Sequence, residues 1–204
     1  SEAMIPEIGN ENTYKNPVIP RSLPDPTIMK ANDGNFYLYA TEDIRNVPIF
    51  CSSDLINWEF LGTAFTDQTR PTFVSRGGIW APDINYINGK YVLYYAMSVL
   101  GGEWDCGIGF ATADRPEGPF TDHGKFFRSD EIDKQNSIDP CYFEENGKKY
   151  LFWGSFHGIY GIELSDDGLT LKPGAQKVQV AGTAYEVTYI HKRNGYYYLF
   201  ASTG

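Results

Sequence analysis

Long apolar runs, helical patterning and positive charge are all scarce in this sequence of 204 residues. No run of apolar residues approaches the roughly 20 that a membrane-spanning helix needs, and no segment shows a convincing amphipathic helix. Lys and Arg number 17 against 26 Asp and Glu, which leaves a formal net charge of −9. Because an acidic protein repels phosphate backbones and anionic lipids, we expect a neutral or cationic partner and no binding to nucleic acid or membrane.

Cysteine is also rare, since the chain contains only Cys51, Cys106 and Cys141. Their number is odd and their spacing is wide, so they match neither a disulfide framework nor a metal-binding motif. We interpret all three as small buried apolar side chains. The spacing of His, Cys and acidic residues along the chain predicts no metal site either.

Aromatic residues are abundant instead, at 16% with 15 Tyr and 13 Phe, and they favour strands over helices. The length suits one sizeable domain. Residues 1–20 are rich in Pro, Asn and Glu and indicate an irregular lead-in segment, so we assign the domain to residues 21–204. The chain starts without an intact signal peptide, and we expect a secreted or periplasmic protein from which that peptide has been removed.

One sequence motif occurs four times along the chain. Each copy opens with a carboxylic acid, passes through an Asn-Gly or Asp-Gly turn and returns as an aromatic-rich strand, which is a strong hairpin signal. The copies open at Asp25, Asp83, Asp139 and Glu186. Their turn glycines are Gly34, Gly89, Gly147 and Gly195, at intervals of 55, 58 and 48 residues. A hairpin repeat of that length is typical of a propeller blade.

Further strand candidates complete the blades. Alternating runs at Asn35–Ala40 and Lys90–Ala96 are followed by paired candidates at Pro48–Ser52 with Glu59–Ala64, Ile108–Thr112 with Lys125–Arg128, and Gly158–Leu164 with Gln176–Val180. The chain is therefore predicted to be all-β, with about three and a half propeller blades. An open arc would expose a large apolar face, so we expect the missing blades to come from a further chain segment; a compact four-bladed ring is the alternative.

The recurring acids suggest a reaction. Hydrolysis of a glycosidic bond takes two carboxyl groups, one to donate a proton and one to activate water, and a third nearby raises the pKa of the donor. A single Asp-Pro is more often a turn. Because the acid persists in successive copies while its flanks change, the pattern favours a functional role.

Four motifs occur in order at blade spacing: Leu23-Pro24-Asp25-Pro26-Thr27-Ile28, Ile79-Trp80-Ala81-Pro82-Asp83, Ser137-Ile138-Asp139-Pro140, and Glu186 before Tyr189-Ile190 and Gly195-Tyr196-Tyr197-Tyr198-Leu199-Phe200. Together they resemble glycoside hydrolase family 43, the inverting five-bladed β-propeller enzymes that act on arabinan and xylan. The resemblance runs from about Pro20 to the end of the chain. Val187 after Glu186 is a mild departure from the family pattern.

The resemblance implies roles for these residues. Asp25 would be the general base, Asp139 would tune the pKa and orientation of the acid, and Glu186 would be the general acid. Asp83 matches none of this trio and is expected to be a substrate-contacting or structural residue. Trp80 would either stack on a sugar or pack in the core.

The substrate follows from two further segments. Gly154-Ser155-Phe156-His157-Gly158-Ile159 and Tyr198-Leu199-Phe200-Ala201-Ser202 resemble the arabinanase branch. The implied enzyme is an inverting hydrolase that cleaves α-L-arabinofuranosyl linkages in arabinan or a related plant cell-wall polysaccharide. Phe156 would form a subsite wall and His157 could donate to a sugar hydroxyl, whereas we interpret His123 and His191 as surface residues.

Three alternatives stay open. Within the enzymes these are an exo-α-L-arabinofuranosidase and a β-xylosidase, and outside them a non-catalytic carbohydrate-binding propeller. We expect no cofactor within this chain. In arabinanases a histidine from beyond the matched region helps to hold a metal ion, so the resemblance implies a structural metal at the propeller axis once that region is supplied.

Overall fold

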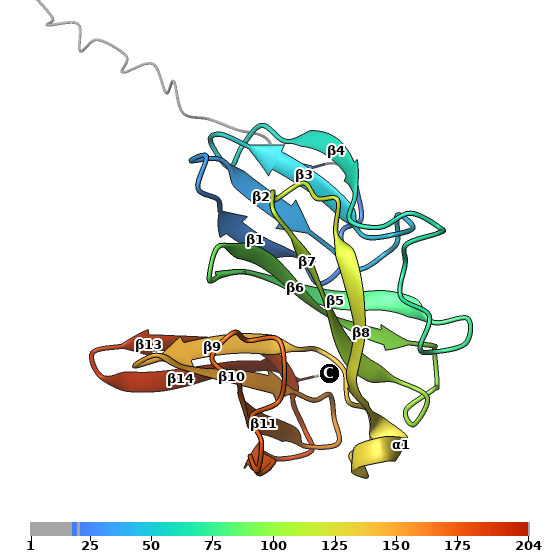
Figure 1. The fold of residues 1–204 in the computed structure, drawn as a ribbon, viewed down its shortest axis with the longest axis vertical. Coiled ribbons are helices and arrows are strands. Elements are labelled where there is room, and N and C mark those ends of the chain that lie inside the picture. The colour runs from blue at the N-terminus through green and yellow to red at the C-terminus, as the bar shows by residue number, and fades with distance from the viewer. Residues whose placement is uncertain (1–17, 20, 204) are drawn as a thin grey trace, which may run out of the picture.

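Each of the four predicted turns closes a hairpin between the first two strands of a separate antiparallel sheet (Figure 1). The computed structural model describes residues 18–19 and 21–203. The predicted lead-in, residues 1–20, therefore falls almost wholly outside the described residues. At the turns, Gly34, Gly89, Gly147 and Gly195 all have positive φ, between 76° and 85°, which glycine adopts at little cost.

The sheets follow one another along the chain as simple meanders. The first contains β1 (Thr27–Lys30), β2 (Phe36–Tyr39), β3 (Pro48–Ser52) and β4 (Glu59–Thr63). The second contains β5 (Gly78–Ile87), β6 (Lys90–Ser98), β7 (Gly107–Ala113) and β8 (Thr121–Arg128). The third contains β9 (Cys141–Glu145), β10 (Lys148–Trp153), β11 (Ile159–Leu164) and β12 (Val178–Ala181), and the fourth pairs β13 (Glu186–Arg193) with β14 (Tyr196–Ser202).

The predicted all-β propeller architecture is confirmed. Among the described residues there are three sheets of four strands and a fourth sheet of two strands. The first strand of each sheet contacts the first strand of the next, since β1 meets β5, β5 meets β9 and β9 meets β13. These four strands line the inside of the arc and bring their starting residues together.

The packing between sheets explains why β6 is buried along almost its whole length. Side chains alternate between the two faces of a strand. Leu93 and Tyr95 accordingly pack in the core against the first sheet, whereas Val92 and Tyr94 pack in the core against the third sheet. An aromatic and aliphatic run that is buried on both faces is what a central blade requires.

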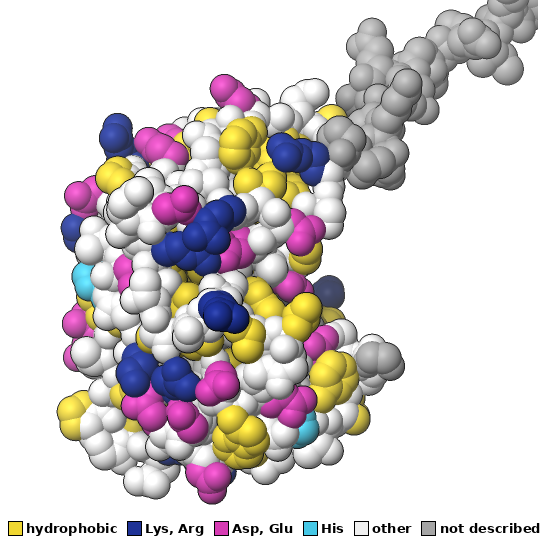
Figure 2. Space-filling view, turned by 90° about the vertical axis from the view of Figure 1, so that its right-hand side faces the viewer, with side chains coloured by type: hydrophobic (Ala, Val, Ile, Leu, Met, Phe, Trp, Pro, Cys, Tyr) yellow, Lys and Arg dark blue, Asp and Glu magenta, His cyan; other side chains and the backbone are white. Residues whose placement is uncertain are grey.

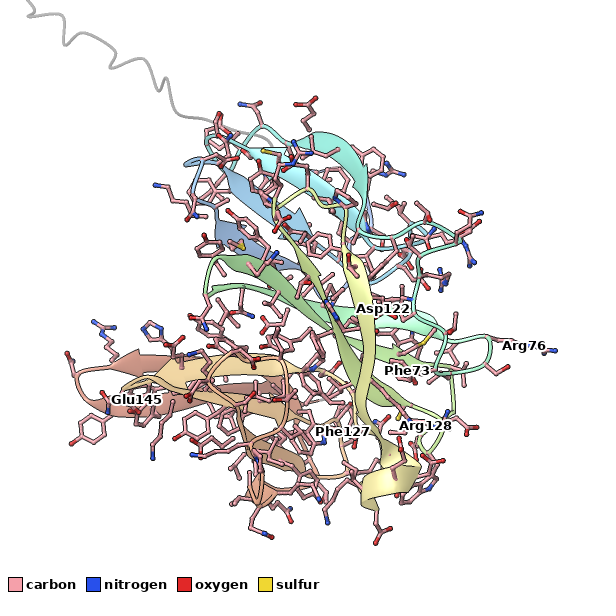
Figure 3. All side chains as sticks on the ribbon, viewed as in Figure 1. Phe73, Arg76, Asp122, Phe127, Arg128 and Glu145 are labelled. Carbon is pink, nitrogen blue, oxygen red and sulfur yellow. The ribbon has the colours of Figure 1, made fainter. Side chains whose placement is uncertain are left out.

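Among residues 18–19 and 21–203, one short helix interrupts the strands. The helix α1 (Ser129–Ile132) is a single turn that follows β8. Just before it, Arg128 Nη1 donates to the carbonyl of Phe73 at 2.8 Å and ties the end of β8 to the loop that precedes β5 (Figure 3). No helix in the described part of the chain is long and apolar enough to cross a membrane.

The cysteine prediction is correct for two residues and wrong for the third. Cys106 and Cys141 are buried and all three thiols are free, but Cys51 is only half-buried. The reason is its place on β3, where its side chain packs against the edge of the core between the first and second sheets. His123 and His191 are exposed, as predicted.

Candidate active site

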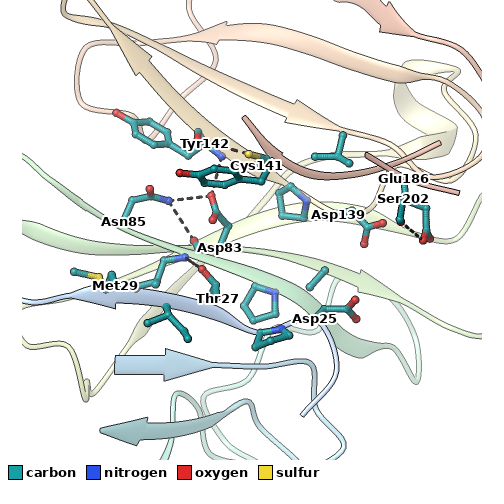
Figure 4. Close-up of a pocket in the computed structure, with 18 of the residues that line it drawn as sticks. Asp25, Thr27, Met29, Asp83, Asn85, Asp139, Cys141, Tyr142, Glu186 and Ser202 are labelled. Carbon is teal, nitrogen blue, oxygen red and sulfur yellow. Dashed lines mark hydrogen bonds between the residues drawn. The ribbon is translucent and has the colours of Figure 1, made fainter. Parts of the chain in front are cut away.

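The first strands converge on a pocket of about 940 Å³ (Figure 4). Its lining includes four acids, which are Asp25, Asp83, Asp139 and Glu186. The four acids that the sequence pattern singled out are therefore brought together, although they come from four different sheets.

Asp25 lies two residues before the start of β1 and has a left-handed backbone, with φ of 48°. Thr41 Oγ1 donates to Asp25 Oδ2 at 3.0 Å. The same hydroxyl accepts from the backbone N–H of Ala81 at 2.7 Å. A loop of the first sheet and a strand of the second thus orient the Asp25 carboxylate together.

Asp139 has the same local geometry, with φ of 58° before Pro140. Its half-buried side chain has a pKa raised to about 8, first by burial and then by the negative charges of Glu186 and Asp25. A left-handed non-glycine residue before proline is strained, and strain of this kind is concentrated at functional sites. Asp139 is therefore close enough to both other carboxyl groups for their charges to disfavour its ionised form.

The strand registers correct one part of the repeat interpretation. The residue with left-handed φ before proline in the second sheet is Ala81, with φ of 43°, and not Asp83. Asp83 pairs with Tyr94 as Thr27 pairs with Tyr39, so Asp83 corresponds to Thr27 and lies two residues further along the strand than the position of Asp25. The sequence comparison misplaced it because the alignment followed the acid, whereas Ala81-Pro82 occupies the place that Asp25-Pro26 and Asp139-Pro140 hold in the other sheets.

Asp83 links three sheets. Its Oδ2 accepts from the N–H of Tyr142 on β9 at 2.8 Å and from Asn85 Nδ2 at 3.0 Å, and the hydroxyl of Thr27 on β1 is a further partner. Burial raises the pKa of Asp83 to about 6, although these hydrogen bonds act in the opposite direction. The residue lines the pocket and also joins β1, β5 and β9.

Glu186 begins β13 and is held by two hydroxyl groups. Ser155 Oγ donates to its Oε1 at 2.7 Å, and Ser202 Oγ donates to its Oε2 at 3.3 Å. The residue before Ser155 must be glycine, because Gly154 has φ of 137° and an added Cβ would lie 2.1 Å from the carbonyl oxygen of Gly158. The tight loop between β10 and β11 therefore positions Ser155 against Glu186.

Trp80, Phe156 and His157 do not line the described pocket. Trp80 packs against Ala96, Cys106 and Ile138, so the structure favours its core-packing interpretation. Phe156 is partly exposed, and its N–H donates at 2.9 Å to the carbonyl of Tyr185, the residue before Glu186. His157 Nε2 lies 3.3 Å from Glu103 Oε1.

Sequence reasoning missed the hydroxyl groups that support the acids. Ser155 and Ser202 both lie in segments that the resemblance had singled out, but nothing in their spacing identifies them as partners of Glu186. Thr41 follows the strand β2 and carries no motif at all. Only the pairing of strands places these three hydroxyls beside carboxylates.

The described residues contain no ligand set for the axial metal ion that the resemblance implies. No three His, Cys, Asp or Glu side chains in that part of the chain are arranged to hold a metal ion. The described residues alone therefore do not fit a metal ion at the propeller axis.

The family model for glycosyl hydrolases family 43 matches residues 14–204. The chain belongs to this family. The extracellular endo-α-(1→5)-L-arabinanase 1 of Bacillus subtilis is 36% identical over 194 residues, which cover 88% of this chain and 59% of that protein. A probable arabinan endo-1,5-α-L-arabinosidase A of Aspergillus clavatus is 32% identical over 192 residues, which cover 90% of this chain and 59% of that protein.

Solved structures agree with this family assignment. The α-L-arabinanase of Cellvibrio cellulosa complexed with arabinohexaose matches with a TM-score of 0.80 at 27% identity, covering 90% of this chain and 65% of that one. An exo-1,5-α-L-arabinanase from a bovine ruminal metagenomic library matches with a TM-score of 0.74 at 29% identity, covering 89% of this chain and 64% of that one. The chain spans about 59% of the length of the curated relatives named above.

Proposed function

We propose that the protein is an inverting glycoside hydrolase that cleaves α-L-arabinofuranosyl linkages in arabinan or a related plant cell-wall polysaccharide. The observation that carries this proposal is the pocket itself, in which Asp25, Asp139 and Glu186 converge and the charges of the other two raise the pKa of Asp139. A cluster of interacting carboxyl groups can hold a proton at neutral pH and can also supply a base, as glycosidic hydrolysis requires.

In the proposed reaction, Asp25 removes a proton from water as the water attacks the anomeric carbon, and Glu186 donates a proton to the departing glycosidic oxygen. Thr41 holds the Asp25 carboxylate, and Ser155 and Ser202 hold that of Glu186. These hydrogen bonds limit rotation of the two carboxyl groups, which pre-organises them for the transition state.

Asp139 keeps a proton within the cluster. At pH 7 its pKa of about 8 leaves it largely protonated, whereas the oxygens of Glu186 accept hydrogen bonds from two serines. We propose that the protonated Asp139 carboxyl tunes and orients the Glu186 side chain, and that Glu186 delivers the proton to the departing oxygen.

Arabinan is the proposed substrate because the relatives and the structural neighbour named above are arabinan-cleaving enzymes. A neutral polysaccharide also suits the charge of the protein. On the face shown in Figure 2, Lys and Arg side chains are interspersed with Asp and Glu and form no continuous basic surface for a polyanion. The role of His157 as a sugar donor would require its contact with Glu103 to open.

The whole protein is proposed to act outside the cell, where plant polysaccharides are found. One relative is named as extracellular. We also propose that a further chain segment supplies the blades and the axial metal ligands that the resemblance implies, because this chain spans only about 59% of its relatives.

The test is hydrolysis of linear arabinan, arabino-oligosaccharides and aryl arabinofuranoside and xyloside substrates. The Glu186→Ala variant is expected to lose at least about 10²-fold in kcat, because it lacks the proton donor. The anomer released first, followed by NMR, is expected to have the inverted configuration.

The matched control is Glu59→Gln on the exposed strand β4, which should keep full activity. Binding of arabinan without product release from either protein would replace the enzyme with a sugar-binding propeller. Release from the xyloside alone would replace arabinan with xylan.

A further inference from the structure

A second cavity, of about 630 Å³, lies between the first and second sheets at the turn ends of their strands. We call it the turn pocket and define it by six lining residues, Asn32, Asp33, Tyr86, Tyr91, Arg115 and Glu117. They come from the β1–β2 turn, from the β5–β6 hairpin and from the turn after β7. Because the chain runs from Asp25 through β1 towards Asn32, the turn pocket is about 20 Å from Asp25 by strand rise.

Tyrosine rings form one wall of the turn pocket. Tyr86 is 45% exposed, and its ring centroid lies 4.8 Å from that of the buried Tyr91. The contact with Tyr91 fixes the orientation of the Tyr86 ring. A rigid aromatic face in a concave site offers an apolar surface to the C–H groups of a sugar ring, next to polar groups that can bind its hydroxyls.

Hydrogen-bond donors and acceptors surround this wall. The Tyr91 hydroxyl accepts from the N–H of Asn32 at 3.3 Å and, within the described residues, keeps its own proton free to donate. Arg115 adds guanidinium donors and Glu117 adds carboxylate acceptors. The Asp33 carboxylate also lines the site, and its two oxygens already accept from the Tyr37 hydroxyl and the Asn35 N–H. The pair between Arg115 and Glu117 is loose, at 3.5 Å, so both groups are free to turn towards a ligand.

The charges around the turn pocket favour a neutral ligand. An anion would meet Asp33 and Glu117, whereas a cation would meet Arg115. At the rim, Lys90 and Asp114 neutralise each other at 2.5 Å. An uncharged compound with many hydroxyl groups can donate to the carboxylates and accept from the guanidinium. Its binding buries no unpaired charge of its own.

We propose that the turn pocket is a second sugar-binding site, which holds a stretch of the same neutral polysaccharide that the catalytic pocket cleaves. The identity of that sugar rests on the proposed function. A chain bound at two sites raises the effective concentration of polymer at the acids, so the site should affect polymer and leave short substrates unaffected.

The first test compares two double variants, each made in the inactive Glu186→Ala protein for binding and in the active protein for turnover. Arg115→Ala with Glu117→Ala is expected to weaken the affinity for linear arabinan by about fivefold to tenfold. Its turnover of an aryl arabinofuranoside should be unchanged. The control is Arg45→Ala with Asp67→Ala, another exposed pair, at 2.7 Å, that should match the parent in both measurements.

The second test uses Cys51, which lines the turn pocket and is the one half-buried thiol, whereas Cys106 and Cys141 are buried. Arabino-oligosaccharide should slow the modification of Cys51 by a small thiol reagent in the Glu186→Ala protein. It should give no protection when Arg115 and Glu117 are also replaced.

Equal arabinan affinity in both double variants, or an unprotected Cys51, would overturn the turn-pocket site while leaving hydrolysis intact. Conversely, protection of Cys51 by xylo-oligosaccharide without arabinan hydrolysis would support the site and contradict the proposed substrate. The two proposals therefore fail separately.

Discussion

At the scale of single residues, Asp139 has the most informative environment in the pocket. Its burial and the charges of Glu186 and Asp25 act in the same direction, and together they raise its pKa to about 8. Among the described residues that line the pocket, the positively charged side chain is Lys30, which lies at the other end of β1 and not beside Asp139. The protein therefore maintains a carboxyl group in an environment that disfavours its charged form.

The Asp139→Asn variant should be more stable at high pH and much less active. Because the folded-state pKa exceeds the ordinary value near 4, the native protein binds more protons than the unfolded chain between about pH 4 and 8. The stability of the parent should fall as pH rises through that window, and the variant should lose this slope. We expect a flatter profile of melting temperature against pH, a higher melting temperature at pH 8, and a decrease in kcat of about 10²-fold or more.

Calorimetry and kcat measured from pH 4 to 9 check this prediction. The control is Asp166→Asn, at an exposed turn position, which should follow the parent curve. If the Asp139→Asn curve merely runs parallel to that of the parent, the pKa of Asp139 is not raised in the folded protein.

At the scale of secondary-structure elements, Asp83 joins β1, β5 and β9 through Thr27, its own strand and Tyr142. Asp25 lies two residues before Thr27, and Asp139 lies three residues before Tyr142. A change at Asp83 is therefore transmitted to both proposed catalytic residues through short lengths of strand.

Replacement of Asp83 should separate positioning from charge. Asp83→Ala leaves the Tyr142 N–H and the Asn85 amide without their acceptor, and we expect a loss of about 1–3 kcal/mol in unfolding free energy and about tenfold in kcat. Asp83→Asn keeps an acceptor and should recover most of the activity. Urea unfolding and kcat measure the two effects, and equal activity of both variants would show that Asp83 does not position the acids.

Hairpins were the elements most accurately predicted from sequence. The hairpin run at Asn35–Ala40 contains β2, and the run at Lys90–Ala96 lies within β6. Of the further strand candidates, Pro48–Ser52 agrees with β3 in full. The outer strands were predicted less well, since β8 begins four residues before the expected Lys125 and β12 extends to Ala181. Tight turns are coded locally by Asn-Gly, whereas an outer strand has weak hydrophobic alternation and is defined by its partner.

At the scale of the whole molecule, the positions of the acids depend on packing between sheets. Trp153 is fully buried between the second and third sheets, where its ring centroid lies 4.7 Å from that of Phe127. Its Nε1 donates to Ser137 Oγ at 3.1 Å, two residues before Asp139. The core between the sheets thus supports the segment that holds Asp139.

The Trp153→Ala variant should destabilise the whole molecule and reduce activity. The cavity left by the ring is expected to cost about 3–5 kcal/mol in unfolding free energy. Trp153→Phe keeps a ring against Phe127 but loses the bond to Ser137, and about 1–2 kcal/mol is expected. Chemical denaturation of both variants provides the check, and equal stability would show that the two sheets pack independently of this side chain.

The sequence by itself determined the all-β class, the four hairpins and the recurring acids Asp25, Asp83, Asp139 and Glu186, because turn chemistry and alternation are local and the repeat is visible along the chain. Only the tertiary structure decided that Asp83 occupies a different strand position, that Trp80 packs in a core, and that Thr41, Ser155 and Ser202 support the carboxylates. These facts depend on strand register and on contacts between sheets. Such contacts join residues far apart in the chain, and no local pattern encodes them.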